Sequence, residues 1–276
     1  MEFSFHSFFS EFMANFSYGY VIAGLVVGFI VGMTGVGGGS LMTPILLHFG
    51  ISPTSAVGTD LLYAAITKGN GVFVHQKKKN VDWLITILLA SGSIPAAVLT
   101  LVAVHHFQVK ASGSATNAAI TLSLGIALLL TAVAILFRKP LVDWSHRNDV
   151  IFTRMSDKQR HIASVFIGIG LGVIVTITSI GAGALGTMAL FLIYPLLRTS
   201  KLIGTEIAHA VPLTLIAGLG HASMGNVNFN LLLNLLIGSL PGIWIGSHLA
   251  GTVPDKYVRP ALSVMLVYAG IKLILK

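Results

Sequence analysis

The stretch Gly35-Val36-Gly37-Gly38-Gly39-Ser40 interrupts a strongly apolar part of the sequence. A fainter version, Ile180-Gly181-Ala182-Gly183-Ala184, stands in the second half of the chain. Glycines at this density stop a helix and leave backbone amides without partners. At membrane depth such backbone is tolerated only where it lines a cavity or is buried against protein. We therefore expect these two glycine turns to be the paired halves of one binding site.

The composition identifies the class of protein. Of 276 residues, 54% are hydrophobic and only 9% are charged, whereas a soluble domain carries about 25% charged residues. The sequence therefore predicts a polytopic protein of the lipid bilayer. Its net charge of +8 comes from Lys and Arg in short loops between apolar runs, which the positive-inside rule explains without nucleic acid as a partner. The chain has no cysteine and no His/Asp/Glu grouping with metal-ligand spacing, so neither a metal nor a cofactor is predicted.

Ten apolar runs are candidates for membrane segments, since a spanning helix needs about 20 mainly apolar residues. They lie at 18–34, 40–50, 58–75, 83–104, 119–137, 161–179, 184–197, 204–221, 229–250 and 258–275. The runs 40–50 and 184–197 are short and follow the glycine turns, so they either cross fully or form re-entrant hairpins. The polar stretch 138–160 is predicted to be a cytoplasmic linker loop between two membrane repeats, 1–137 and 161–276.

The two halves carry matching polar landmarks. Gly58-Thr59-Asp60 corresponds to Gly204-Thr205-Glu206, and Asn80-Val81-Asp82 corresponds to Asn226-Val227-Asn228. One spacing separates both pairs, so the alignment needs no gap over this stretch. Chance alignment of apolar helices would supply Leu and Ile matches but not these polar ones. The chain therefore contains an internal repeat.

The distribution of charge indicates that the second half is inverted. Lys77–Lys79 fill one turn, whereas the equivalent turn, Ala222–Gly225, has no charge. Corresponding loops therefore lie on opposite sides, as five spans per half also require. An outside N-terminus puts most Lys and Arg in the cytoplasm and leaves Lys110, Lys272 and Lys276 outside. We predict an all-α fold of two inverted repeats, with about five membrane segments each and helices interrupted at the glycine turns, as in secondary transporters.

Free amides at a helix N-terminus form a concave positive site for a small anion, which the helix dipole strengthens. The predicted anion-binding residues of the turns are Gly37, Gly38, Gly39 and Ser40 from the first and Gly181 and Gly183 from the second. The alternative is close helix packing through small residues. A nucleotide phosphate loop is excluded because no Gly-Lys-Ser/Thr ending follows.

Lys68 lies in the middle of an apolar run and is the only basic residue placed within a span by this topology. A cation there is costly, so it faces a cavity, an acid or a bound anion. We predict that it binds the substrate, with assistance from Thr59 and Thr205. The alternative is an ion pair with Asp60 or Glu206.

Asp60 and Glu206 follow equivalent Gly-Thr pairs, so either could simply cap a helix near the interface. Glu206 has His209 three residues later, on the same helical face. A carboxylate beside an imidazole within a membrane could take up and release a proton. We therefore predict proton coupling by Asp60, Glu206 and His209. His75 and His221 occupy equivalent positions at span ends, where histidines are usually solvated.

The sequence Gly-Val-Gly-Gly-Gly-Ser-Leu-Met-Thr-Pro (35–44), the paired Gly-Thr motifs and the Asn-Val-Asp-Trp turn (80–83) resemble the sulfite exporter TauE/SafE family of membrane permeases. The resemblance extends from about residue 20 to 275. It implies transport of small, often sulfur-containing anions, such as sulfite, sulfoacetate and similar organosulfonates, across the bacterial inner (plasma) membrane.

Three functions remain open at this level. The first is a secondary transporter for a small anion, working by alternating access and coupled to protons. The second is an uncoupled anion channel with the same lining. The third is a membrane-embedded enzyme that uses Glu206 and His209 as acid and base, although no other feature of the sequence requires one. A homo-oligomer is compatible with the sequence.

Overall fold

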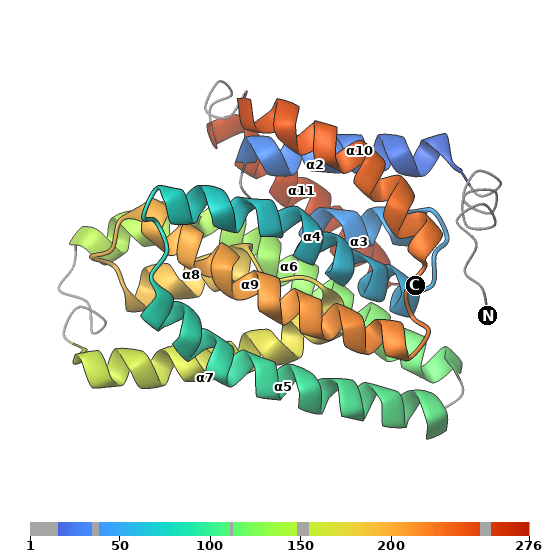
Figure 1. The fold of residues 1–276 in the computed structure, drawn as a ribbon, viewed down its shortest axis with the longest axis horizontal. Helices are drawn as coiled ribbons and strands as arrows, with labels where there is room; N and C mark the ends of the chain where they lie inside the picture. Colours follow the sequence, from blue (N-terminus) through green and yellow to red (C-terminus); the bar gives the residue numbers. More distant parts are fainter. Residues whose placement is uncertain (1–15, 35–38, 111–112, 148–154, 249–254, 276) are drawn as a thin grey trace.

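The computed structural model describes residues 16–34, 39–110, 113–147, 155–248 and 255–275 (Figure 1). Over these residues the chain forms α-helices and no strand, which confirms the predicted all-helical class. The helices are α2 (Tyr18–Thr34), α3 (Gly39–His48), α4 (Pro53–Lys77), α5 (Trp83–Lys110), α6 (Gly113–Arg147), α7 (Asp157–Thr178), α8 (Ala184–Ile193), α9 (Thr199–Ser223), α10 (Phe229–His248) and α11 (Asp255–Ile274). Each helix coincides with one predicted apolar run.

Five helices in the described part of the chain are long and apolar enough to cross a membrane. Their apolar segments are Trp83–Phe107, Ala118–Phe137, Asp157–Thr178, Thr199–Ser223 and Phe229–Gly246. Shorter apolar helices cover Tyr18–Gly32, Ala184–Ile193 and Pro260–Ile274. Helix α4 is 25 residues long but less apolar, because it carries Asp60 and Lys68. These lengths agree with a multi-pass membrane protein.

The helices pack in pairs drawn from opposite halves of the chain. Helix α2 lies along α10 on one side of the molecule, and α5 lies along α7 on the opposite side (Figure 1). Between these two pairs, α4 packs against α9. The buried apolar core includes Leu61 of α4 and Leu213 of α9, both without exposed surface. The centre of the molecule is therefore built equally from both halves.

Close contacts between the halves are reciprocal. A Cβ atom on Gly24 of α2 would lie 2.2 Å from the carbonyl oxygen of Leu235 in α10. A Cβ atom on Gly168 of α7 would likewise lie 2.2 Å from the carbonyl oxygen of Leu89 in α5. Leu89 and Leu235 are equivalent positions of the sequence repeat. Such an exchange is what a two-fold relation between the halves would produce, whether the two copies are parallel or inverted.

The connection between the halves differs from the predicted loop 138–160. Helix α6 continues to Arg147, and α7 begins at Asp157 after a capping box formed by Ser156 and Gln159. The backbone hydrogen bonds of a helix do not depend on apolar side chains, so α6 extends beyond its apolar segment into the polar stretch. Residues 148–154 lie outside the described part of the chain.

An ion pair joins the two halves near the C-terminal end of α4. Lys201 Nζ of α9 is 2.8 Å from Asp82 Oδ2 in the α4–α5 turn. Partial burial alone would raise the pKa of Asp82, but the hydrogen bond and charge of Lys201 outweigh it and hold the pKa below its ordinary value. At the opposite end Asn228 stands where Asp82 would be, so an ion pair cannot form there.

We expect Asp82→Asn to lower the free energy of unfolding by at most about 1 kcal/mol at pH 7, because the pair is partly exposed. The pKa of Asp82 is lower in the folded state than its unfolded-state value of about 3.9, so the ion pair stabilises the protein above that pH. This stabilisation is lost as the pH falls through the folded-state pKa. Thermal unfolding in detergent should therefore show the difference at pH 7 and lose it well below pH 4. The double variant of Asp82→Asn with Lys201→Gln should be no less stable than Asp82→Asn alone. If the stability losses of the two single variants simply add, the two side chains do not form a stabilising ion pair.

Candidate functional site

The second glycine turn separates α7 from α8 and requires its glycines. Gly181 has φ +110° and Gly183 has φ +152°, conformations that side chains with a Cβ rarely adopt. Gly183 precedes α8 without a side-chain cap. The amides of Ala184 and Leu185, at the start of α8, have no hydrogen-bond partner among the described residues. The turn therefore presents the uncapped positive end of a helix, as the sequence predicted.

Lys68 extends from α4 to this turn. Its Nζ donates a hydrogen bond to the carbonyl oxygen of Ala182, the residue between the two glycines. Its charge is attracted to Glu206 first and to Asp60 second. The structure thus brings the predicted lysine, the second glycine turn and both predicted acids into one cluster, although they come from three separate segments: α4, the turn and α9.

Asp60 is completely buried on α4 and is held by a residue that sequence reasoning did not single out. Thr43 Oγ1 of α3 donates a hydrogen bond of 2.5 Å to Asp60 Oδ2. The buried hydroxyl of Ser179 lies near the same carboxylate. Asp60 Oδ1 has no hydrogen-bond partner among the described residues. The signal for Thr43 was its place in the motif that begins with the first glycine turn.

The first glycine turn itself is only partly described. Gly37 and Gly38 lie outside the described residues. Gly39 is the first residue of α3, and Ser40 follows it in the helix. Through Thr43 this short helix donates a hydrogen bond to Asp60, whereas the second short helix, α8, meets Glu206 by the close approach of Gly186.

Glu206 of α9 is 2% exposed and faces α8. A Cβ atom on Gly186 would lie 3.0 Å from Glu206 Cγ and 3.2 Å from Oε1, so glycine lets this side chain lie close against α8. Oε1 has no hydrogen-bond partner among the described residues. Glu206 and Asp60, equivalent in the repeat, are therefore both buried carboxylates with an unpartnered oxygen near one lysine.

His209 does not pair with Glu206 as the helical spacing suggested. Its Nε2 lies 2.8 Å from Ser93 Oγ of α5, and both side chains are buried. The equivalent position in the first half is Tyr63, whose hydroxyl lies near Ser239, the equivalent of Ser93. His209 thus contacts α5 and Tyr63 contacts α10. The repeated Gly-Ser-x-Pro sequence at 92–95 and 238–241 was the signal for these serines.

Thr59 and Thr205 bind backbone at the ends of the helix pairs. Thr59 Oγ1 accepts from the amide of Asn228 at 3.1 Å, and Thr205 Oγ1 accepts from the amide of Asp82 at 2.9 Å. Both threonines are almost completely buried. Their hydroxyls therefore join the two halves, and the structure does not bring them to Lys68. His221 also has a structural contact, with the Thr176 carbonyl oxygen 3.0 Å from its Nε2.

Comparison with known proteins identifies relatives of this chain over almost its entire length. The family model described as sulfite exporter TauE/SafE matches residues 20–273. Probable membrane transporter protein YjnA of Bacillus subtilis is 38% identical over 254 residues, which cover 92% of this chain and 98% of that protein. Probable membrane transporter protein YdhB of the same organism is 26% identical over 92% of this chain and 98% of its own length.

An archaeal protein, probable membrane transporter protein MJ0441 of Methanocaldococcus jannaschii, is 27% identical over 92% of this chain and 94% of its own length. No solved structure gives a significant match. The match to the family model and the apolar helices together show a multi-pass transporter of the bacterial plasma membrane. The relatives' description as transporters points away from an enzyme. The chain belongs to the sulfite exporter TauE/SafE family.

Proposed function

We propose that this transporter moves a small anion, sulfite or an organosulfonate, by alternating access, and that protons bound by Glu206 and Asp60 are carried with it. The observation that carries the proposal is the cluster of Lys68, the uncapped start of α8 and two buried, incompletely hydrogen-bonded carboxylates. The description of the family model as a sulfite exporter supports sulfite as the proposed substrate.

The anion site is built from complementary positive groups. The amides of Ala184 and Leu185 are directed by the helix dipole, which favours negative charge at this end. Lys68 supplies a full positive charge beside the same turn. In our proposal an incoming anion replaces the Ala182 carbonyl as the partner of the lysine. The sequence prediction adds Gly37, Gly38, Gly39 and Ser40 to this site from the first half of the chain.

Proton coupling follows from the balance of charges. One lysine faces two carboxylates, so the cluster is already net negative when both acids are ionised. Two like charges about 5 Å apart repel by roughly 3 kcal/mol at an effective dielectric constant of about 20. An anion therefore enters readily only when at least one carboxylate is protonated. Glu206 and Asp60 are the groups proposed to bind the proton, whereas His209 is hydrogen-bonded elsewhere.

Alternating access is supported by how the halves meet. The contacts of α2 with α10 and α5 with α7 are reciprocal, as expected for inverted copies that exchange roles during transport. Glu206 and Asp60 lie on the central helices α9 and α4, where such a site would be reached alternately from each side. The ion pair of Asp82 with Lys201 closes one end and has no counterpart at the Asn228 end.

Uptake of sulfite into proteoliposomes under an imposed pH gradient tests this function. We expect saturable uptake that an inward proton gradient accelerates. Glu206→Gln cannot release a proton, so its uptake should lose most of the response to the gradient. The matched control is Asp157→Asn, which changes an exposed acid at the start of α7 and should behave as the unaltered protein.

Two results would contradict the proposal. Flux of the unaltered protein that neither saturates nor responds to pH would indicate the uncoupled channel. A melting temperature that none of sulfite, sulfoacetate, sulfate, taurine or simple carboxylates raises would argue against a small anion as substrate, because a bound ligand stabilises the folded state.

A further inference from the structure

A large groove lies between α3, α6 and α11, and it is separate from the cluster around Lys68. Its volume is about 1100 Å³, above the roughly 300–1,000 Å³ of most small-molecule pockets. None of the predicted anion-binding or proton-coupling residues lines it. A sulfur oxyanion is far smaller than this space, so the groove does not match the proposed substrate in size.

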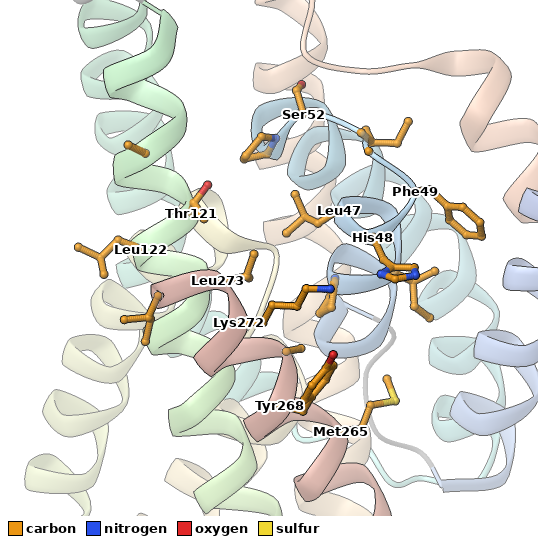
Figure 2. A pocket seen from close by; sticks show the side chains of 18 residues that line it. Leu47, His48, Phe49, Ser52, Thr121, Leu122, Met265, Tyr268, Lys272 and Leu273 are labelled. Carbon is orange, nitrogen blue, oxygen red and sulfur yellow. The ribbon is translucent and has the colours of Figure 1, made fainter. Parts of the chain in front are cut away.

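The walls of the groove are mainly apolar. Leu47 of α3, Leu122 of α6 and Leu273 of α11 are among the residues that line it, and all three are labelled in Figure 2. Met265 lines it two helical turns before Lys272, a separation of about 10 Å along α11. Leu122 is 49% exposed, so the groove is open to the surroundings of the helices, which in a membrane are lipid chains.

One end of the groove carries a positive charge. Lys272 lies in the last turn of α11, and its Nζ is 6.0 Å from the centre of the Tyr268 ring. Figure 2 shows the side chain pointing across the groove toward His48 of α3. Ser52 lines the groove from the loop that follows α3. No Asp or Glu occurs among the described residues that line the groove, so none of them neutralises this lysine.

We propose that this groove binds an anionic phospholipid, with its phosphate at Lys272 and an acyl chain along the apolar walls toward Met265. A cation at the end of a membrane helix, beside an apolar groove between helices, matches an amphiphile whose negative headgroup and hydrocarbon chain are joined end to end. Tyr268 has the place of an interfacial aromatic residue, with an apolar ring against the chain and a hydroxyl near the headgroup.

A second copy of the chain fits this groove less well. A symmetric dimer presents the same face from both copies. Two copies meeting on this face would bring their Lys272 side chains toward each other without an acid from the lining residues between them. Repulsion of these charges disfavours such a dimer, whereas the phosphate of a lipid neutralises the lysine.

A bound lipid would contact the helix that carries half of the proposed transport site. Pro44 of α3 lines the groove, and its neighbour Thr43 is hydrogen-bonded to Asp60 on the buried side. The lipid would therefore support α3 from outside while α4 supports it from inside. This placement does not depend on the identity of the transported anion.

Lipid retention by the purified full-length protein tests the proposal. After exchange into detergent, the protein is supplied with phosphatidylglycerol or with phosphatidylcholine of the same chains, and bound lipid is counted by native mass spectrometry. We expect retention of phosphatidylglycerol, and about fivefold weaker binding after Lys272→Gln, since one cation near a lipid surface contributes about that factor. The matched control Lys158→Gln, at an exposed lysine of α7, should leave retention unchanged.

Three outcomes would overturn the proposal. They are equal retention of both lipids, an unchanged affinity of Lys272→Gln for phosphatidylglycerol, or stabilisation by inorganic phosphate alone equal to that by the lipid.

Because the chain has no cysteine, the variant Leu122→Cys gives a second readout. Phosphatidylglycerol should protect its thiol from a maleimide, whereas efficient disulfide dimers through this position would indicate a second copy in the groove.

Discussion

Lys68→Ala is expected to weaken anion binding by at least about 30-fold, because removing one member of a buried charged cluster costs about 2 kcal/mol or more. Lys68 is the positive side chain that contacts the second glycine turn. Without it an anion would meet two carboxylates, Asp60 and Glu206, with only backbone amides to compensate. The measurement is the shift in melting temperature with sulfite or sulfoacetate, taken relative to each variant without ligand.

Two further variants separate binding from folding. Lys68→Met keeps the length and apolar part of the side chain, so it should fold like the unaltered protein and still lose the anion-induced shift. Lys158→Ala removes an exposed lysine from α7 and should retain the full shift. An unchanged affinity in a folded Lys68→Met protein would remove this lysine from the site and with it the charge argument for proton coupling.

Gly168→Ala is expected to destabilise the protein severely. The added Cβ would lie 2.2 Å from the carbonyl oxygen of Leu89, so α7 and α5 would have to separate along their contact. Overpacking of this kind costs about 1–3 kcal/mol or more. The equivalent contact of Gly24 with Leu235 has the same distance, and Gly24→Ala should therefore cause a loss of similar size.

Gly170→Ala is the matched control two residues along the same helix. Nothing lies within 4 Å of a Cβ built there, and alanine favours a helix over glycine by about 1 kcal/mol. The two variants should therefore differ by roughly 2 kcal/mol or more in thermal or denaturant unfolding in detergent. Equal stabilities would mean that the close contact between α7 and α5 does not hold the helices together.

Much of the candidate site could be predicted from local patterns. Glycine density located the turn at Gly181 and Gly183, and burial of a charge in an apolar run located Lys68. The i, i+3 spacing predicted a Glu206–His209 pair, which the structure does not form, because His209 is directed toward Ser93 and Glu206 toward Gly186. Helical spacing states which residues share a face but not which neighbouring helix each side chain meets.

Sequence by itself determined the membrane setting, the positions of the described helices and the matching landmarks of the two halves, because hydropathy, helix breaking by glycine and repetition are local properties. Only the tertiary structure decided that Thr43 binds Asp60, that Lys68 extends to Ala182, and that α3, α6 and α11 leave a groove at Lys272. Each of these contacts joins different elements, and the last two join segments far apart in the chain. Their geometry depends on how whole helices pack, which no short stretch of sequence encodes.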